Sequence, residues 1–174
     1  MWLGVFTTED PVANDQQFRS KSLYIATRGV KEYRATIPDL VHTSDTVLEL
    51  GCEWGTTTAL LAHHAGLVIG SDVSRGVVEQ ARLRHPGIRF EVLDAFDVLS
   101  LLRLEVPFTK VYLDLSDVSG YRSLLDLIAL LNSLAAVLRP DAIVVKSGAL
   151  KDFASRCRTW NRVPGHPDCG HQGM

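Results

Sequence analysis

The chain has 174 residues, of which 46% are hydrophobic and 22% are charged. This length suits one globular domain, and this composition excludes a disordered chain. The formal net charge of −2 argues against strong autonomous binding to nucleic acid, because neutralising phosphates requires clustered cationic side chains.

We expect neither a membrane span nor a secretory signal. No apolar run reaches the ~18 residues that span a bilayer, and the N-terminal MWLGVF is too short for a signal peptide and lacks a basic flank. The three cysteines, an odd number, provide no disulfide framework. These features predict a cytoplasmic protein.

The basic residues cluster in two flanks around an acidic centre. Residues 19–34 and residues 139–162 are rich in lysine and arginine, whereas most acidic residues lie between them. If the fold brings the flanks together, they form one basic patch. The alternative is that they are solvated helix faces.

Periodicity predicts one α/β domain over residues 18–150. Residues 1–17 show no pattern and are expected to form a loose arm, while the apolar positions of residues 18–41 recur at helical spacing and predict one or two helices. Short apolar runs, expected to be strands, then alternate with helical stretches; the runs are 46–50, 67–71, 88–93, 110–115 and 142–146, and the helices are 56–65, 75–84 and 123–138, with an irregular stretch near 95–104. This alternation predicts a Rossmann-like, doubly wound, mostly parallel sheet. A helix near 151–160 and a flexible tail complete the expected order, so that residues 151–174 lie outside the domain.

The first of these runs ends in a glycine turn. Glu49 is followed by Gly51, which permits a tight turn, and by Gly55, which lets a ligand approach the backbone where the next helix begins. A dinucleotide fingerprint would place a second glycine where Glu53 stands, and the charge of Glu53 would repel a pyrophosphate. A nicotinamide-dependent oxidoreductase is therefore a disfavoured alternative.

Acidic residues and a lysine end the other runs, at the edge where open α/β sheets bind ligands. Asp72 can accept hydrogen bonds from both hydroxyls of a ribose, and Asp94 can accept one from an adenine amino group, with the backbone after it reading the ring. Asp114 and Lys146 end the fourth and fifth runs and can meet at the reacting end of the crevice. The plainer alternatives are a helix cap for Asp72, a solvated loop position for Asp94, and a structural ion pair between Asp114 and Lys146.

This ensemble resembles the class I S-adenosylmethionine-dependent methyltransferases over roughly residues 18–150. The resemblance implies the fold of that family and S-adenosyl-L-methionine as the cofactor. The cofactor-binding residues that it implies are Glu49, Gly51, Cys52, Gly55, Asp72, Val73, Asp94, Ala95 and Asp114. Cys52 can equally be a small packing residue, and Glu53 departs from the family, which often has a small residue there.

Three short pieces of the sequence also resemble fibrillarin and the related FtsJ-type RNA 2′-O-methyltransferases. The pieces are residues 18–21, 55–57 and 145–147, and Lys21, Asp114 and Lys146 match the lysine, aspartate and lysine of those families. The resemblance implies that these three residues are catalytic, because a lysine held by an aspartate can orient a ribose hydroxyl and ease its proton loss. An RNA ribose 2′-hydroxyl is the leading acceptor, and a small-molecule or protein acceptor is the alternative.

The segment after Lys146 is too short for the two further strands with which class I methyltransferases normally finish. The run 142–145 would then be an exposed apolar edge, which a second copy or a partner chain covers unless the chain is truncated. The alternative function is thus a non-catalytic or truncated module of this fold that acts as an S-adenosylmethionine-binding or partner subunit. Two thiols and two imidazoles in the same segment fit no established zinc spacing, so no metal is expected; they are Cys157, His166, Cys169 and His171.

Overall fold

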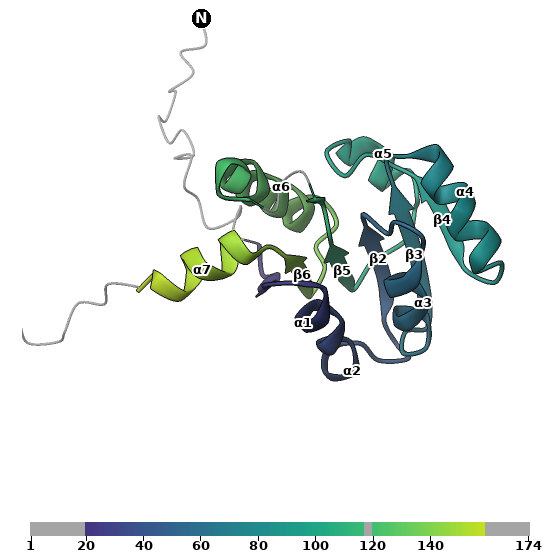
Figure 1. Ribbon diagram of the computed structural model, residues 1–174, viewed down its shortest axis with the longest axis horizontal. Coiled ribbons are helices and arrows are strands. Elements are labelled where there is room, and N and C mark those ends of the chain that lie inside the picture. Colours follow the sequence, from purple (N-terminus) through teal and green to yellow (C-terminus); the bar gives the residue numbers. More distant parts are fainter. Residues whose placement is uncertain (1–19, 117–119, 159–174) are drawn as a thin grey trace, which may run out of the picture.

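The computed structural model describes residues 20–116 and 120–158, which form one six-stranded parallel sheet with helices packed around it (Figure 1). Along the sheet the strands follow the order β1-β6-β5-β2-β3-β4. The strands are β1 (Leu23–Thr27), β2 (Thr46–Leu50), β3 (Leu67–Asp72), β4 (Arg89–Val92), β5 (Lys110–Leu113) and β6 (Ala142–Lys146). The predicted doubly wound, mostly parallel sheet is confirmed, and every strand pairing among the described residues is parallel.

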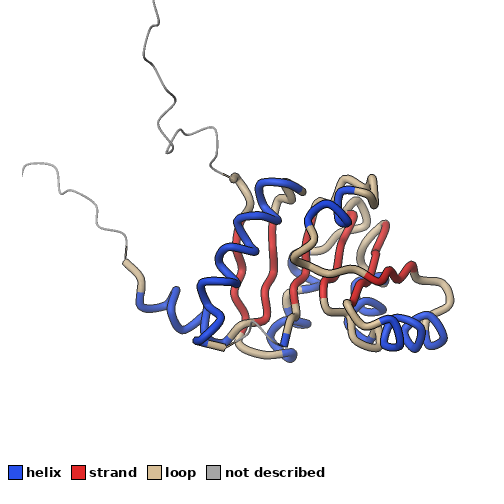
Figure 2. The backbone as a smooth tube through the Cα atoms, turned by 90° about the horizontal axis from the view of Figure 1, so that it is seen from above, coloured by secondary structure: helices blue, strands red, loops and turns tan. Residues whose placement is uncertain are grey.

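Helices pack on both faces of the sheet, so that the strands form a middle layer (Figure 2). The helices are α1 (Val30–Ala35), α2 (Ile37–Leu40), α3 (Thr56–Ala62), α4 (Arg75–Arg84), α5 (Val98–Leu102), α6 (Leu124–Val137) and α7 (Gly148–Arg156). One core cluster joins α5 and α6 to the sheet, and a second joins α1, α2 and α3 to the opposite face. Because both faces are covered, the central strands can be apolar along their whole length.

Helix α6 shows why the sequence pattern succeeds here. Its leucines recur at helical spacing, and Leu127, Leu131 and Leu134 are buried against the sheet. Each fully buried leucine contributes roughly 1.5–3 kcal/mol relative to an exposed one. The helix ends before Arg139 and Pro140, since a proline disfavours helical geometry in the residue before it.

The prediction that residues 18–41 form only helices is wrong at its start, because Leu23–Thr27 is strand β1. This strand pairs with β6, from Leu23 beside Ala142 to Thr27 beside Lys146. Its side chains Leu23 and Tyr24 are exposed, so the run lacks the apolar continuity of the central strands. The edge of β6 is therefore covered by the chain itself, and the expectation that a second copy or a partner chain covers it is wrong.

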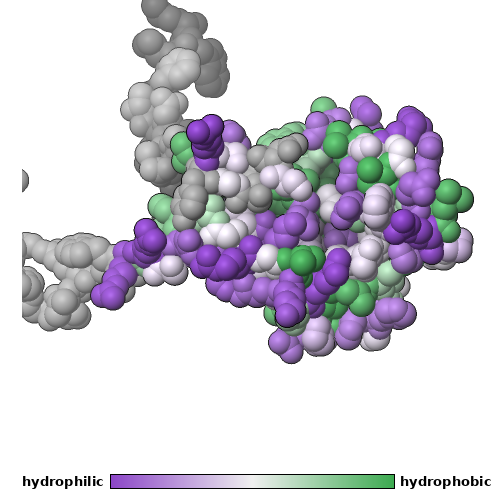
Figure 3. Space-filling model, viewed as in Figure 1, coloured by the Kyte–Doolittle hydropathy of each residue, from purple (hydrophilic) through white to green (hydrophobic). Residues whose placement is uncertain are grey.

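Ion pairs connect the two basic flanks that the sequence shows. Arg28, which follows β1, pairs with Asp152 of α7, and Lys151 of α7 pairs with Glu32 of α1. Hydrophilic atoms lie on the surface over α7, beside paler, less polar ones (Figure 3). The flanks do meet, but these basic side chains face acidic ones, so the surface there is an ion-pair network more than a cationic patch.

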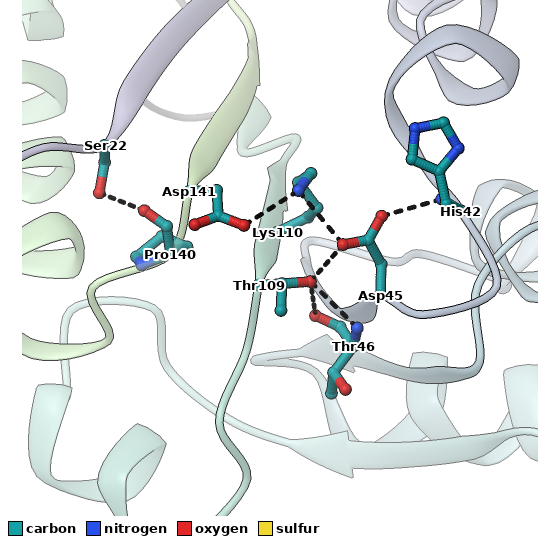
Figure 4. Close-up of polar contacts among 8 residues, drawn as sticks. All are labelled: Ser22, His42, Asp45, Thr46, Thr109, Lys110, Pro140 and Asp141. Carbon is teal, nitrogen blue, oxygen red and sulfur yellow. Dashed lines mark hydrogen bonds and ion pairs between the residues drawn. The ribbon is translucent and has the colours of Figure 1, made fainter.

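A polar cluster connects the amino ends of β2, β5 and β6 (Figure 4). Lys110 Nζ lies 3.2 Å from Asp45 Oδ1 and 3.4 Å from Asp141 Oδ2. The Thr109 hydroxyl and the His42 amide donate hydrogen bonds of 2.7 and 2.8 Å to the Asp45 carboxylate. Burial alone would raise the pKa of Asp45, but these hydrogen bonds and Lys110 outweigh it and hold the pKa below its usual value. The cluster fixes the ends of the strands that lie opposite the predicted site.

Several predictions concern residues outside the described ranges. The loose arm at 1–17 and most of the C-terminal segment lie there, including His166, Cys169 and His171. Within residues 20–116 and 120–158, no group of three or more His, Cys, Asp or Glu side chains is arranged to hold a metal ion. Among those residues no helix is both long and apolar enough to cross a bilayer.

Candidate functional site

A cleft of 440 Å³ opens at the carboxyl ends of the central strands. It is lined by Leu50, Gly51, Glu53, Ser71, Asp72, Val73, Leu93, Asp94, Ala95, Phe96, Asp114, Leu115, Ser116 and Lys146. These residues come from the ends of β2, β3, β4, β5 and β6 and from the loops that follow. The cleft thus lies where open α/β sheets place their ligands.

The glycine turn after β2 forms one wall of this cleft. Gly51 has a φ of 86°, and a Cβ at this position would lie 2.0 Å from the carbonyl oxygen of Asp114. Gly55 has a φ of 81°, and a Cβ there would lie 2.7 Å from the ring of Phe90. Both glycines are therefore required by backbone conformation and by packing. Gly55 does not line the cleft, so its absent side chain makes room for Phe90 and His85 and not directly for a ligand.

Asp72 ends β3 with its carboxylate held by two backbone amides. The amide of Ser74 donates to Asp72 Oδ1 at 3.0 Å, and the amide of Glu53 donates to Oδ2 at 3.2 Å. Glu53 takes a left-handed conformation, with φ 49°, that brings its amide to this position. A carboxylate has about four lone-pair sites, so Asp72 can still accept hydrogen bonds from a ligand. The helix-cap alternative is not what the structure shows, since Ser74 is the N-cap residue of α4.

Asp94 follows β4 and is exposed at the far side of the cleft. Its Oδ1 accepts a 2.9 Å hydrogen bond from the amide of Phe96, which fixes the loop. The apolar side chains of Val73 and Phe96 also line the cleft and are largely exposed, whereas Ala95 is buried. This part of the cleft thus combines a carboxylate with apolar walls.

Asp114 and Lys146 form an ion pair between the ends of β5 and β6. Their side chains are 18% and 25% exposed, and both line the cleft. A partly buried pair is screened less by solvent and salt than a surface pair. The structure therefore brings together the two predicted residues from neighbouring strands.

Two predicted cofactor residues lie beneath the cleft and do not line it. Glu49 is buried, and its Oε2 accepts a hydrogen bond from the Thr58 hydroxyl of α3. Burial raises the pKa of Glu49 to about 8, and the nearby charge of Asp114 adds to this rise. Cys52 packs with Val78 and Phe90, and burial raises the pKa of its thiol. The position of Cys52 therefore fits the packing alternative better than contact with a ligand.

Lys21 is not brought together with Asp114 and Lys146. It precedes β1, so it lies at the amino end of that strand, whereas Thr27 at the other end lies beside Lys146. Roughly 16 Å of strand, at about 3.3 Å per residue, separates Lys21 from the cleft edge. The sequence predicts a helix at Lys21, whereas the structure places Lys21 before β1, at the edge of the sheet formed by the amino ends of the strands.

Helix α1 contributes two residues near the site that sequence reasoning missed. Arg34 Nε donates a 2.9 Å hydrogen bond to Thr57 Oγ1 in the first turn of α3. Tyr33 packs edge-on against Tyr112 of β5, with ring centroids 5.3 Å apart. No sequence motif marks either residue, because the position of α1 depends on packing across the sheet.

Comparison with known proteins identifies the domain. Residues 47–141, more than half of the chain, match a family model described as a methyltransferase domain. No curated protein matches the sequence. The solved structure of DesVI from Streptomyces venezuelae is 27% identical, with a TM-score of 0.53 over 67% of this chain and 51% of that chain. A TehB-like SAM-dependent methyltransferase from Corynebacterium glutamicum is 19% identical, with a TM-score of 0.51 over 71% of this chain and 68% of that chain.

The sugar N-methyltransferase KedS8 from Streptoalloteichus shares the fold, with 17% identity and a TM-score of 0.50 over 67% of this chain and 46% of that chain. The chain therefore spans about half the length of DesVI and of KedS8. The family match is consistent with the parallel sheet and with the position of the cleft at the carboxyl ends of its strands. The chain belongs to this family of methyltransferase domains.

Proposed function

We propose that this chain binds S-adenosyl-L-methionine in the carboxyl-end cleft and transfers its methyl group to an acceptor beside Asp114 and Lys146. One observation carries the proposal: a single cleft collects Asp72, Asp94, Asp114 and Lys146 from the ends of four strands. Its volume of 440 Å³ is in the range of roughly 300–1,000 Å³ typical of small-molecule sites.

The donor set of the cleft fits this cofactor. Asp72 is the proposed acceptor for the two ribose hydroxyls, since its carboxylate is oriented by two backbone amides and keeps lone pairs free. The adenine would lie between the exposed side chains of Val73 and Phe96, with Asp94 and the backbone at Ala95 reading its edge. The backbone at Gly51, which lines the cleft, is the proposed contact for the methionine end. Glu49 and Gly55 support this turn from below.

When bound, the cofactor would supply a methyl group on a positively charged sulfonium sulfur, and the neutral thioether S-adenosylhomocysteine would be the leaving group. The chain's own contribution is orientation, because placing acceptor and methyl group in line accounts for much of such a rate enhancement. The Asp114 carboxylate orients the acceptor's N–H or O–H, and Lys146 holds that carboxylate in place. The proton that the acceptor loses passes to this pair or to water.

An RNA ribose 2′-hydroxyl is the more specific acceptor hypothesis, and the Asp114–Lys146 pair supports it. Its third residue, Lys21, lies at the other end of the sheet, so the hypothesis depends on two residues and not on three. A small molecule or protein with an amine or hydroxyl group is the alternative. Incubation with tritium-labelled cofactor and each acceptor class tests this choice by which class becomes labelled.

A non-catalytic module that keeps the cofactor is the alternative function. The substitution Lys146→Ala separates the two functions. An enzyme loses label transfer while it keeps cofactor binding, and the control Lys151→Ala, which breaks an ion pair outside the cleft, keeps both. A wild-type chain that binds the cofactor and labels no acceptor supports the non-catalytic module.

A further inference from the structure

The Tyr33 hydroxyl is buried without a hydrogen bond. The whole side chain is inaccessible to solvent, and within residues 20–116 and 120–158 nothing accepts from or donates to its oxygen. Buried polar groups in native proteins are nearly always satisfied, so each exception calls for a physical reason. Tyr112, its ring partner, differs in this respect, because its hydroxyl lies 3.1 Å from the Thr36 hydroxyl.

The Tyr33 hydroxyl lies within electrostatic reach of a carboxylate that lines the cleft. Tyr33 packs on Tyr112. Asp114 follows Tyr112 by two residues in the extended chain, so the side chains of Tyr112 and Asp114 project toward the same face of the sheet, on which α1 packs. Glu49 is the register partner of Tyr112 on the neighbouring strand. Burial raises the pKa of Tyr33 well above its ordinary value, and the charges of Glu49 and Asp114 raise it further. The hydroxyl therefore lies within electrostatic reach of both carboxylates.

Asp114 carries a complementary exception. Its Oδ1 is buried and accepts no hydrogen bond among the described residues, although the ammonium group of Lys146 is paired with it. A donor and an acceptor, each without a hydrogen bond, thus lie within electrostatic reach of each other. Glu49 is less suited as the partner of Tyr33, because its Oε2 already accepts from Thr58.

We propose that Tyr33 is a positioning residue of this site, whose hydroxyl donates a hydrogen bond to Asp114 when a ligand occupies the cleft. Lys146 stays paired with Asp114, and the Tyr33 hydroxyl orients the carboxylate together with it. Tyr33 lies outside residues 47–141, so helix α1 adds this function to the matched domain. The inference depends on the proposed binding of the cofactor in this cleft.

Thermal unfolding of the free chain and calorimetric binding of S-adenosylhomocysteine test the proposal together. In the free chain Tyr33→Phe removes an unsatisfied hydroxyl, so the melting temperature stays unchanged or rises by about 2–4 °C. The affinity for S-adenosylhomocysteine falls by about tenfold, because the bound chain loses a hydrogen bond to a charged group. Affinity thus falls without a loss of stability.

Tyr112→Phe is the matched control, since it removes a buried hydroxyl that has a partner outside the cleft. It lowers the melting temperature and leaves the affinity within about twofold. In the Asp114→Asn background, Tyr33→Phe causes no further loss of affinity, because the two residues act as one unit. Unchanged affinity in Tyr33→Phe, or additive losses in the double variant, overturns the proposal. A wild-type chain that is folded and binds no S-adenosylhomocysteine overturns the proposed function and this inference with it.

Discussion

The buried carboxyl group of Glu49 makes the stability of the chain depend on pH in an unusual direction. Its pKa rises from the usual 4.5 to about 8, chiefly through burial. Between these values the folded chain keeps a proton on Glu49 that the unfolded chain releases. The contribution of Glu49 to stability is therefore fully present below its unfolded pKa and is lost as the pH rises through the folded one.

The substitution Glu49→Gln isolates this effect, because glutamine has the shape of the protonated carboxyl and its oxygen can still accept from Thr58. Each pKa unit corresponds to about 1.4 kcal/mol, so the shift sets an upper limit of roughly 5 kcal/mol. Between about pH 5.5 and about pH 8.5 we expect wild-type stability to fall by about 2–4 kcal/mol relative to Glu49→Gln. The variant should be the more stable chain at the higher pH.

Urea unfolding followed by circular dichroism at both pH values measures this difference. Glu79→Gln, at an exposed position of α4, is the control and should leave the pH dependence of wild type unchanged. If wild type and Glu49→Gln change in parallel with pH, Glu49 is ionised at neutral pH and the reasoning from burial is refuted.

Two further predictions concern the glycine turn and the cluster at the amino ends of the strands. Gly51→Ala should destabilise the chain and abolish binding of S-adenosylhomocysteine, since its Cβ would overlap the carbonyl oxygen of Asp114; wild-type calorimetry for this variant would contradict the packing argument. Asp45→Asn should cost about 1–3 kcal/mol in urea unfolding at neutral pH, because it leaves Lys110 without its buried partner. The control Asp141→Asn, at a carboxylate that is 77% exposed, should change stability little. Since the pKa of Asp45 is lowered on folding, its contribution should disappear only in strong acid, as the pH falls through the folded value; loss at higher pH would contradict the assignment.

The central strands and the cleft could be predicted from the sequence because their signals are local. β2, β3 and β5 are short apolar runs, as covered parallel strands require. The polar residue that ends each run marks the carboxyl edge of the sheet, so Asp72, Asp94, Asp114 and Lys146 could be assigned to one site before their contacts were known. The spacing of these residues along the chain is sufficient to predict that they lie at one edge of the sheet.

The remaining features depend on contacts between distant segments. β1 lies at the edge with Leu23 and Tyr24 exposed, and its apolar spacing also suits a helix, so only its pairing with β6 distinguishes the two. The position of Lys21 at the amino end of β1 depends on the same pairing. The sequence predicts Glu49 at the ligand site because it precedes the glycine turn, but its burial depends on the packing of α3 and on Thr58.

Calorimetric titration of the chain with S-adenosylhomocysteine, with Asp72→Ala as the matched variant, tests the central claim most directly. Asp72 lines the cleft and its carboxylate keeps lone pairs for a ribose, so we predict micromolar binding by wild type and its loss in Asp72→Ala. Circular dichroism of both chains controls for folding. No binding by a folded wild-type chain, or equal binding by folded Asp72→Ala, would contradict the account.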